Sequence, residues 1–379
     1  MDFSLNRQQT TLVRQVRDLA ARELQARKGA LASGEEYQSA FLEKLAGQNL
    51  VCPTVPTEYG GLGLDRFSTA LVMEEIAAAD PGVAAVIAAT LHAAEPIILA
   101  GSEEQKRRFL PGLTGAKAGV AAFALTEPTG GSNLSALRTC AVKTDEAYYL
   151  NGGKDYVLNA GQAAWITLVA STVPEPRRTA IRIFLVPADT PGLKTGQRRY
   201  TSGLEYARIG EILFANARVE EENVIRSQEA GSGYLLLAQT FDRGRAMVGA
   251  ISVGIARAAL EEALTFAEER EQFGTALKNH QAIAFALADM ATRVEMARLM
   301  TWKACWLIDR GEDYSTASAM AKLSASEIAQ QVTTQAADIF GARGYERGYF
   351  IEQLVRDARV LSTIEGTNNI QRLFIASQL

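Results

Sequence analysis

The sequence predicts a mainly α-helical protein with a small β-domain in the middle of the chain. Two observations predict this class. Apolar residues recur at three-to-four spacing in both outer parts of the chain, which is typical of amphipathic helices. Between residues 119 and 225, short apolar or alternating runs separated by turn residues are instead typical of strands. With 379 residues, the chain is long enough for two or three packed units.

The first 118 residues are expected to form an N-terminal helical domain. Ser102 and Gln105 have the spacing of a capping box, so a helix should begin there and end near Pro111. Pro56–Gly63 contains one proline and three glycines and is expected to be a loop. Closer to the N-terminus, one helical stripe is formed by Leu12, Val13, Val16, Leu19 and Ala20.

Residues 119–230 are assigned to the β-domain. Asn151-Gly152 is a strong signal for a hairpin, because this pair readily adopts the left-handed backbone of a tight turn. The expected strands include Tyr148–Leu150, Trp165–Ala170, Ile181–Val186 and Glu211–Phe214.

Residues 231–379 return to a helical pattern. An unusually long helix is expected to open with the charged cluster Phe241–Arg245 and to continue to about Glu269. Its apolar face is rich in small residues, which allow close contact between helices. Further helices are expected at Gln281–Arg310, Ser315–Phe340 and Ile351–Val360.

Composition excludes several classes of protein. The net charge is −4 and no block of Lys and Arg is long enough to suggest a nucleic-acid surface. Three separated cysteines and two histidines support neither a metal site nor a redox dithiol, and unpaired thiols suit a reducing compartment. The most apolar stretch, Pro81–Ala94, is expected to be too short to span a bilayer, because Glu95 and Pro96 follow it. A cytoplasmic protein is therefore expected.

Glu365 is the candidate catalytic base. It lies between Ile364 and Gly366, at an expected break between two helical stretches with apolar residues on both sides. A carboxylate in apolar surroundings has a raised pKa, which makes it a better base near neutral pH. Gly366 would let the backbone turn and a ligand approach closely. The alternative is a solvated surface glutamate, the common state of this residue type.

The run Thr126–Ser132 is the second candidate. It contains a proline and two glycines, so it is either a plain turn or a segment whose backbone amides face a phosphate.

These runs resemble motifs of the acyl-CoA dehydrogenase family of flavoenzymes, in its short- and medium-chain form. Arg356-Asp357 and Glu365-Gly366-Thr367 stand at the spacing that this family has before its last helix. The resemblance covers nearly the whole chain. It implies an N-terminal helical bundle, a small β-barrel and a C-terminal four-helix bundle, with domains at residues 1–118, 119–230 and 231–379.

The resemblance implies dehydrogenation of an acyl-CoA thioester to the enoyl-CoA. Glu365 would remove the α-proton, while the β-hydrogen would leave as hydride to N5 of a flavin. The α-proton of a thioester is only weakly acidic, so hydrogen bonds must polarise the thioester oxygen as enolate charge develops. The resemblance assigns these bonds to the amide of Glu365 and to a ribityl hydroxyl of FAD. The flavin supplies the redox chemistry, and the protein supplies position and electrostatics.

The implied cofactor is FAD. Leu125 and Thr126 would bind the flavin ring. Trp165, by residue type more often a core residue, would pack against the flavin, with Thr167 two positions later. In full, the implied FAD-binding residues are Phe123, Leu125, Thr126, Gly131, Ser132, Trp165, Thr167, Arg270, Phe273, Asp338, Gly341, Ala342, Thr367 and Asn369.

Some of these residues would contact the FAD of a neighbouring chain. Arg270 would reach the pyrophosphate with its planar guanidinium group, and Phe273 would pack on the same cofactor. The loop that begins at Gly341 would also receive the partner's FAD, although Asp338 and Ala342 replace a glutamine and a glycine that are common in the family. The implied assembly is a homotetramer, a dimer of dimers.

The resemblance also implies a substrate site and leaves three functions open. The first is an acyl-CoA dehydrogenase that passes electrons to an electron-transfer flavoprotein. The second is an oxidoreductase of an acyl group tethered to a carrier protein, and the third is a non-catalytic flavin-binding relative. Acyl chain length is not determined, and Ile364 replaces a tyrosine frequent in straight-chain enzymes. The implied substrate-binding residues are Ser132, Asp242, Arg245, Ile364 and Gly366.

Overall fold

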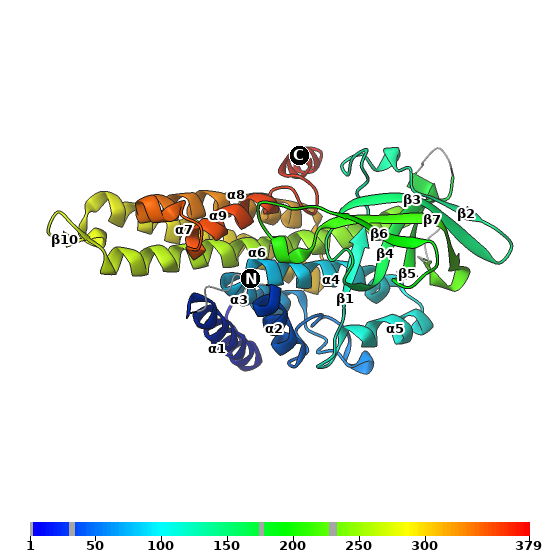
Figure 1. Ribbon diagram of the computed structural model, residues 1–379, viewed down its shortest axis with the longest axis horizontal. Helices are drawn as coiled ribbons and strands as arrows, with labels where there is room; N and C mark the ends of the chain where they lie inside the picture. Colours follow the sequence, from blue (N-terminus) through cyan, green and yellow to red (C-terminus); the bar gives the residue numbers. More distant parts are fainter. Residues whose placement is uncertain (1–2, 30–34, 174–177, 227–232) are drawn as a thin grey trace.

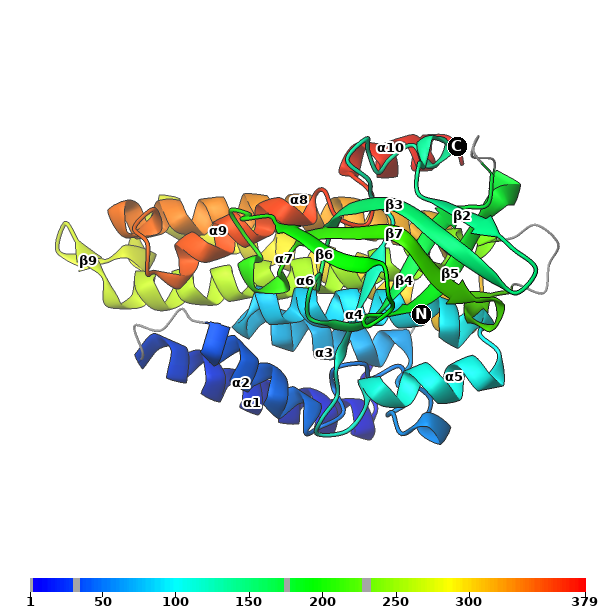
Figure 2. The same ribbon diagram turned by 45° about the vertical axis from the view of Figure 1, so that its right-hand side comes forward.

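The computed structural model describes residues 3–29, 35–173, 178–226 and 233–379. It consists of N-terminal helices, a β-domain and a C-terminal bundle of long helices (Figure 1). The N-terminal helices pack along one side of the long bundle, and the β-domain lies at one end of the molecule (Figure 2). The helical, β, helical order predicted from the sequence is confirmed.

The N-terminal part is held together by helices whose ends are well capped. Its elements are α1 (Arg7–Gly29), α2 (Glu35–Ala46), η1 (Thr57–Tyr59), α3 (Arg66–Ala79), α4 (Pro81–Ala100), α5 (Glu103–Phe109) and η2 (Leu110–Leu113). Asp65 caps α3 by accepting from the amide of Ser68, and Asp80 caps α4 in the same way. The capping box predicted at Ser102 and Gln105 is confirmed at the start of α5. These caps satisfy amides that a helix start leaves unpaired.

The prediction that the apolar stretch Pro81–Ala94 is too short to span a bilayer was wrong on length, because α4 continues through Glu95 and Pro96 to Ala100. Glu95 lies inside the protein and is paired with Arg66 and Arg243. Among the described residues, α4 is the helix that is long and apolar enough to cross a membrane. Most of that stretch, 72%, is buried within the protein, as in the core helix of a globular fold.

The β-domain forms one eight-stranded sheet in two halves. Its strands are β1 (Val120–Ala124), β2 (Cys140–Lys143), β3 (Ala147–Val157), β4 (Ala163–Ser171), β5 (Ile181–Pro187), β6 (Leu193–Arg198), β7 (Gly210–Glu220) and β8 (Val224–Ile225). The order is β6-β7-β3-β2-β4-β5-β8, with β1 pairing β4 in parallel. A single residue pair, Cys140–Ser171, joins β2 to β4. Side chains from both halves share one apolar core, which gives the domain a barrel-like interior.

The hairpin predicted at Asn151-Gly152 was wrong, because this pair lies inside β3. The register against β7 shifts between Leu150 and Gly152, and Gly152 has a φ of 133°. A Cβ at Gly152 would come within 2.8 Å of the Thr139 backbone, so the glycine permits a bulge with close strand approach. The turn between β2 and β3 instead runs from Thr144 to Ala147.

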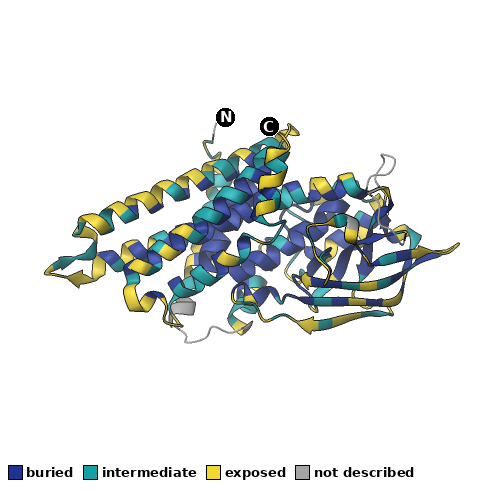
Figure 3. Cartoon of the chain, turned by 90° about the horizontal axis from the view of Figure 1, so that it is seen from above, coloured by how far each residue is buried: buried dark blue, intermediate teal, exposed yellow. Residues whose placement is uncertain are grey.

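The C-terminal part is a bundle of long helices, in which glycine permits close packing against a neighbouring helix. Its elements are α6 (Gly233–Glu269), β9 (Glu271–Gln272), β10 (Thr275–Ala276), η7 (Leu277–Asn279), α7 (Gln281–Arg310), α8 (Ser315–Phe340), η8 (Gly341–Gly344), α9 (Phe350–Leu361) and α10 (Asn368–Ala376). A Cβ at Gly254 of α6 would lie 2.5 Å from the carbonyl oxygen of Glu74, so α6 touches α3 directly. Figure 3 shows burial concentrated where the long bundle meets the N-terminal helices and the β-domain, and its free end exposed.

Candidate active site

Glu365 lies in the connection between α9 and α10, as the sequence predicted. Its φ is +55°, a left-handed backbone that a non-glycine residue rarely adopts, and Gly366 follows at +85°. The Gln371 side-chain amide donates to the carbonyl oxygens of both residues, at 3.2 and 3.0 Å. Lys322 Nζ donates to the Gly366 carbonyl at 2.8 Å. These bonds hold the reversal that turns the Glu365 side chain inward.

The environment of the Glu365 carboxyl confirms the expected shift. Burial raises its pKa to about 7, although the nearby positive charges of Arg245 and Lys322 act in the opposite direction. Its side chain is 21% exposed. Burial also lowers the pKa of Lys322, to about 7. The carboxyl therefore changes charge near neutral pH, as a general base requires.

Glu365 faces a small cavity of about 60 Å³ between α4, α6 and the β-domain. Phe123 and Ile364, both predicted site residues, line this cavity together with Glu365. Most of the lining is apolar. A Cβ at Gly244 of α6 would lie 3.1 Å from Oε2 of Glu365 and would collide with the ring of His92, so the glycine makes room for both groups. The cavity thus places a titratable carboxylate against apolar walls.

His92 of α4 is a site residue that the sequence reasoning missed. Its Nδ1 lies 3.4 Å from Oε2 of Glu365, and its ring packs edge-on against Phe123 with centroids 4.3 Å apart. Burial lowers the pKa of His92 to about 3, so the imidazole is neutral. Neither ring nitrogen has a hydrogen-bond partner among the described residues. The available signal was a lone histidine in the otherwise uncharged run Pro81–Ala94.

Asp242 and Arg245 form an ion pair beside this cavity. The prediction that they open the long helix was wrong, because α6 begins at Gly233. Arg245 lies 2.5 Å from Oδ1 of Asp242, and Ser315 donates to Oδ2 at 2.6 Å. Burial raises the pKa of Asp242. The pair anchors α6 to the start of α8 and brings a positive charge close to Glu365.

A buried ion pair that sequence reasoning did not identify holds the glycine-rich run Thr126–Ser132 in place. Lys154 of β3 lies 2.7 Å from the Glu127 carboxylate and also donates to the Leu125 carbonyl. Burial lowers the pKa of Lys154 to about 8, and the charge of Lys154 and two backbone amides lower the pKa of Glu127 against its burial. Above this pair, Gly131 passes close to Thr126, and Ser132 is exposed. The run is thus a braced turn with an accessible outer surface.

Two predicted flavin contacts have their side chains in the interior. Thr167 is buried and donates to the Ala93 carbonyl at 2.7 Å. Trp165 packs edge-on against Phe109, and its Nε1 has no hydrogen-bond partner among the described residues. The structure therefore gives both side chains a role in joining β4 to the helices, and their contact with a flavin stays a prediction.

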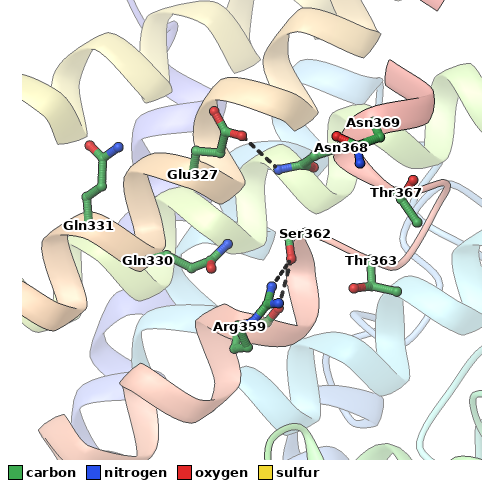
Figure 4. A pocket seen from close by; sticks show the side chains of 9 residues that line it. All are labelled: Glu327, Gln330, Gln331, Arg359, Ser362, Thr363, Thr367, Asn368 and Asn369. Carbon is green, nitrogen blue, oxygen red and sulfur yellow. Dashed lines mark hydrogen bonds between the residues drawn. The ribbon is translucent and has the colours of Figure 1, made fainter. Parts of the chain in front are cut away.

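A second cavity, of about 520 Å³, lies between α8, the end of α9 and α10. Figure 4 shows that its walls carry polar side chains, including the predicted site residues Thr367 and Asn369. Thr367 also caps α10 by accepting from the Ile370 amide at 3.3 Å. This cavity adjoins the Glu365 turn from the bundle side.

Five predicted residues lie far from Glu365, at the free end of the bundle (Figures 1 and 2). Arg270 and Phe273 lie at the C-terminal end of α6 and its hairpin, about 40 Å from Gly244 at 1.5 Å per residue of helix. Phe266 stacks on Phe340 with centroids 4.2 Å apart, which brings the end of α6 beside the end of α8. Phe273 is 96% exposed. The other exposed members of this group are Asp338, Gly341 and Ala342.

Comparisons with known proteins agree with this arrangement. Models of the N-terminal, middle and C-terminal domains of acyl-CoA dehydrogenase match residues 6–117, 122–217 and 231–379. An acyl-CoA dehydrogenase of Bacillus subtilis is 36% identical over 99% of this chain and 98% of its own length. The structure of butyryl-CoA dehydrogenase from Megasphaera elsdenii has a TM-score of 0.92 and 33% identity, covering 100% of this chain and 99% of that one. The prolyl acyl carrier protein oxidase AnaB has a TM-score of 0.91 and 29% identity, with 99% of each chain covered. The chain belongs to the acyl-CoA dehydrogenase family of flavin-dependent oxidoreductases.

Proposed function

We propose that this enzyme removes hydrogens from the α and β carbons of an acyl-CoA thioester, with Glu365 as the base. The observation that carries this proposal is a buried carboxyl, with its pKa raised to about 7, that faces an apolar cavity. A carboxylate with this pKa is half ionised at neutral pH and strong enough as a base to take an activated α-proton. The apolar walls suit the hydrocarbon part of an acyl group.

This chemistry also requires a hydrogen-bond donor to the thioester oxygen, and the backbone at Glu365 can supply one. None of the described residues accepts a hydrogen bond from the Glu365 amide, which the left-handed turn leaves free. This amide is proposed to donate to the thioester oxygen as negative charge develops there. An unused donor in a water-poor site is the feature that such stabilisation needs.

FAD is the proposed cofactor, and when bound it supplies the acceptor for the two electrons. Three features of the chain fit this group: a polar cavity with Thr367 and Asn369, a braced glycine-rich turn with Ser132 exposed, and the unpartnered Nε1 of Trp165. Leu125 and Thr126 would hold the ring at the end of β1. The Thr167 hydroxyl can accept a hydrogen bond while it donates its own proton to the Ala93 carbonyl.

A complete site is proposed to need a second copy of the chain. Arg270 and Phe273 are exposed at the far end of the bundle, so they cannot reach a flavin beside Glu365 of their own chain. They are proposed to close the FAD site of a partner, together with the loop at Gly341. A homotetramer built as a dimer of dimers satisfies this requirement. An electron-transfer flavoprotein is the proposed electron acceptor, and the cytoplasm the proposed location.

The thioester carrier has two candidates. Asp242 and Arg245, beside the cavity, favour CoA, whose pantetheine they would hold with Ser132. The likeness to a prolyl acyl carrier protein oxidase favours an acyl group tethered to a carrier protein. Comparing kcat/KM for one acyl group on CoA and on a carrier protein decides between them.

The test of the proposed function is anaerobic bleaching of the bound flavin by a panel of acyl-CoA substrates. Wild type should bleach with at least one substrate, and Glu365→Gln should keep its FAD and its acyl-CoA affinity while bleaching about 10²–10⁴-fold more slowly. Wild-type rates in Glu365→Gln would mean that another group is the base. No bleaching of wild type by any acyl-CoA or by the same acyl groups on a carrier protein would instead favour a flavin-binding protein without this activity.

A further inference from the structure

We propose that His92 selects acyl groups that carry a hydrogen-bond donor, a hydroxyl or neutral amine, beyond the β carbon. The proposal deepens the proposed function and rests on it. It concerns the acyl end of the substrate, where His92 and Glu365 border the same cavity.

The imidazole of His92 is buried without a hydrogen-bond partner among the described residues. His92 is 4% exposed, and neither Nδ1 nor Nε2 has a partner among the described residues. Phe123 and Phe241 cover the ring, with centroids 4.3 and 5.3 Å away. A buried polar group without a partner destabilises a fold, so its presence beside the base points to a partner that arrives with the substrate.

Of the two ring nitrogens of His92, Nε2 is the one left to accept a hydrogen bond. The imidazole is neutral, so it carries one N–H donor and one acceptor. Nδ1 faces Oε2 of Glu365 at 3.4 Å, and the ionised carboxylate, which is the base form, favours a proton on Nδ1. Nε2 is then an acceptor. A donor on the substrate satisfies it, whereas a carbonyl or ether oxygen does not.

His92, Gly244 and Glu365 line one small cavity of about 60 Å³, and the absence of a side chain at Gly244 leaves room beside both other groups. An acyl group that enters this cavity therefore lies beside the imidazole. A methyl group at the same place would leave Nε2 buried and unpaired, and a site built around a hydrogen bond rejects such an analogue strongly.

The experiment compares matched substrates in the anaerobic reduction of the FAD-bound enzyme by stopped flow. The first pair is 4-hydroxybutyryl-CoA and pentanoyl-CoA, in which a methyl group of the second compound replaces the terminal hydroxyl of the first. The second pair is 4-hydroxypentanoyl-CoA and 4-oxopentanoyl-CoA, in which C4 carries a hydroxyl that can donate a hydrogen bond or a carbonyl that can only accept one. In wild type, the first member of each pair should have a reduction rate constant divided by Kd at least about tenfold higher.

Two variants separate selection from other roles. His92→Leu should lose the preference for the first substrate in both pairs. Val248→Ala alters another wall of the same cavity, so it should change the reduction rate constant divided by Kd by the same factor for both substrates of a pair. Equal rates within the pairs in wild type would overturn the proposal. So would a His92→Leu variant that slows all substrates equally and shifts the pH midpoint, because His92 would then only position Glu365. Should His92→Leu fail to retain FAD, the wild-type pairs alone decide.

The outcome stays distinct from failure of the proposed function. If wild type is bleached by pentanoyl-CoA as readily as by 4-hydroxybutyryl-CoA, the dehydrogenase stands and His92 selection is wrong. If neither an acyl-CoA nor an acyl-carrier-protein thioester bleaches wild type, the dehydrogenase is wrong and the selection falls with it.

Discussion

At the scale of single residues, Glu365 carries two costs that the surrounding side chains offset. Its left-handed backbone is unfavourable by about 1–3 kcal/mol for a non-glycine residue. Burial of its carboxyl disfavours the ionised form, and Arg245 and Lys322 reduce that penalty without cancelling it. Lys322 and Gln371 hold the adjacent carbonyls in place. Both costs are located at the one carboxylate that the proposed reaction uses.

The raised pKa of Glu365 predicts a pH dependence with a definite sign. The base must be ionised, so flavin reduction at saturating acyl-CoA should be slow below pH 6 and rise through an apparent pKa near 7. Because this folded-state pKa lies above the usual value of 4.5, ionising Glu365 also lowers the stability of the fold as pH rises from about 4.5 to about 7. Stopped-flow reduction between pH 5.5 and 9 measures the profile.

Removing Arg245 should move that midpoint upward. Arg245 favours the ionised carboxylate, so Arg245→Gln should require a higher pH for the same fraction of base. The comparison is made at saturating substrate, since Arg245 is also a proposed substrate contact. A midpoint that stays in place would show that its charge does not reach Glu365.

At the scale of elements, a few polar contacts join α9, which leads to Glu365, to the β-domain. Asp357 of α9 accepts from the Leu204 amide at 2.7 Å, and Arg356 donates to the Ser202 carbonyl at 2.5 Å. Burial raises the pKa of Asp357 to about 6. These contacts fasten α9 to the β-domain eight residues before Glu365, which gives the Arg-Asp pair of the sequence motif a structural role.

The Lys154–Glu127 pair under the glycine-rich turn should be essential to stability. Lys154→Met leaves a buried carboxylate without its cation, which costs about 3–5 kcal/mol. The expected result is a lower midpoint in urea denaturation and weaker FAD retention, because Leu125 and Thr126 lose their support.

The double variant Lys154→Met/Glu127→Gln supplies the control. It removes both charges, so it should recover part of the stability that Lys154→Met loses. Equal loss in the single and double variants would mean that the methylene stem of Lys154, rather than its charge, supports the turn.

At the scale of the whole molecule, the long bundle separates two halves of one proposed FAD site. Glu365 lines a cavity together with Phe123 of the β-domain, and Arg270 lies between α6 and β9, the strand at the free end of the bundle (Figures 1 and 2). The separation of about 40 Å along α6 is far longer than any side chain, so only another chain can unite them.

Mixing two impaired variants, each defective in a different half of the site, should therefore restore activity. Arg270→Ala should weaken FAD retention, and Glu365→Gln should remove the base. In a mixed dimer, one site receives Glu365 from the first chain and Arg270 from the second, so random reassembly should recover up to about a quarter of the sites. Flavin bleaching after co-refolding measures the recovery, and absence of any recovery would place Arg270 outside the shared site.

The sequence by itself determined the order of helical and β parts, the capping box at Ser102 and the turn at Glu365, because each depends on neighbours close in the chain. The apolar residues around Glu365 predicted the direction of its pKa shift, but α4, α6 and the β-domain supply the burial that causes it. It misplaced the turn at Asn151-Gly152, where pairing with β7 overrides the local preference for a hairpin. Only the tertiary structure brought His92 of α4 to Glu365, and Lys154 under the glycine-rich turn. The physical reason is that burial and charge pairing depend on which distant segments pack together, and residue spacing along the chain carries no measure of that.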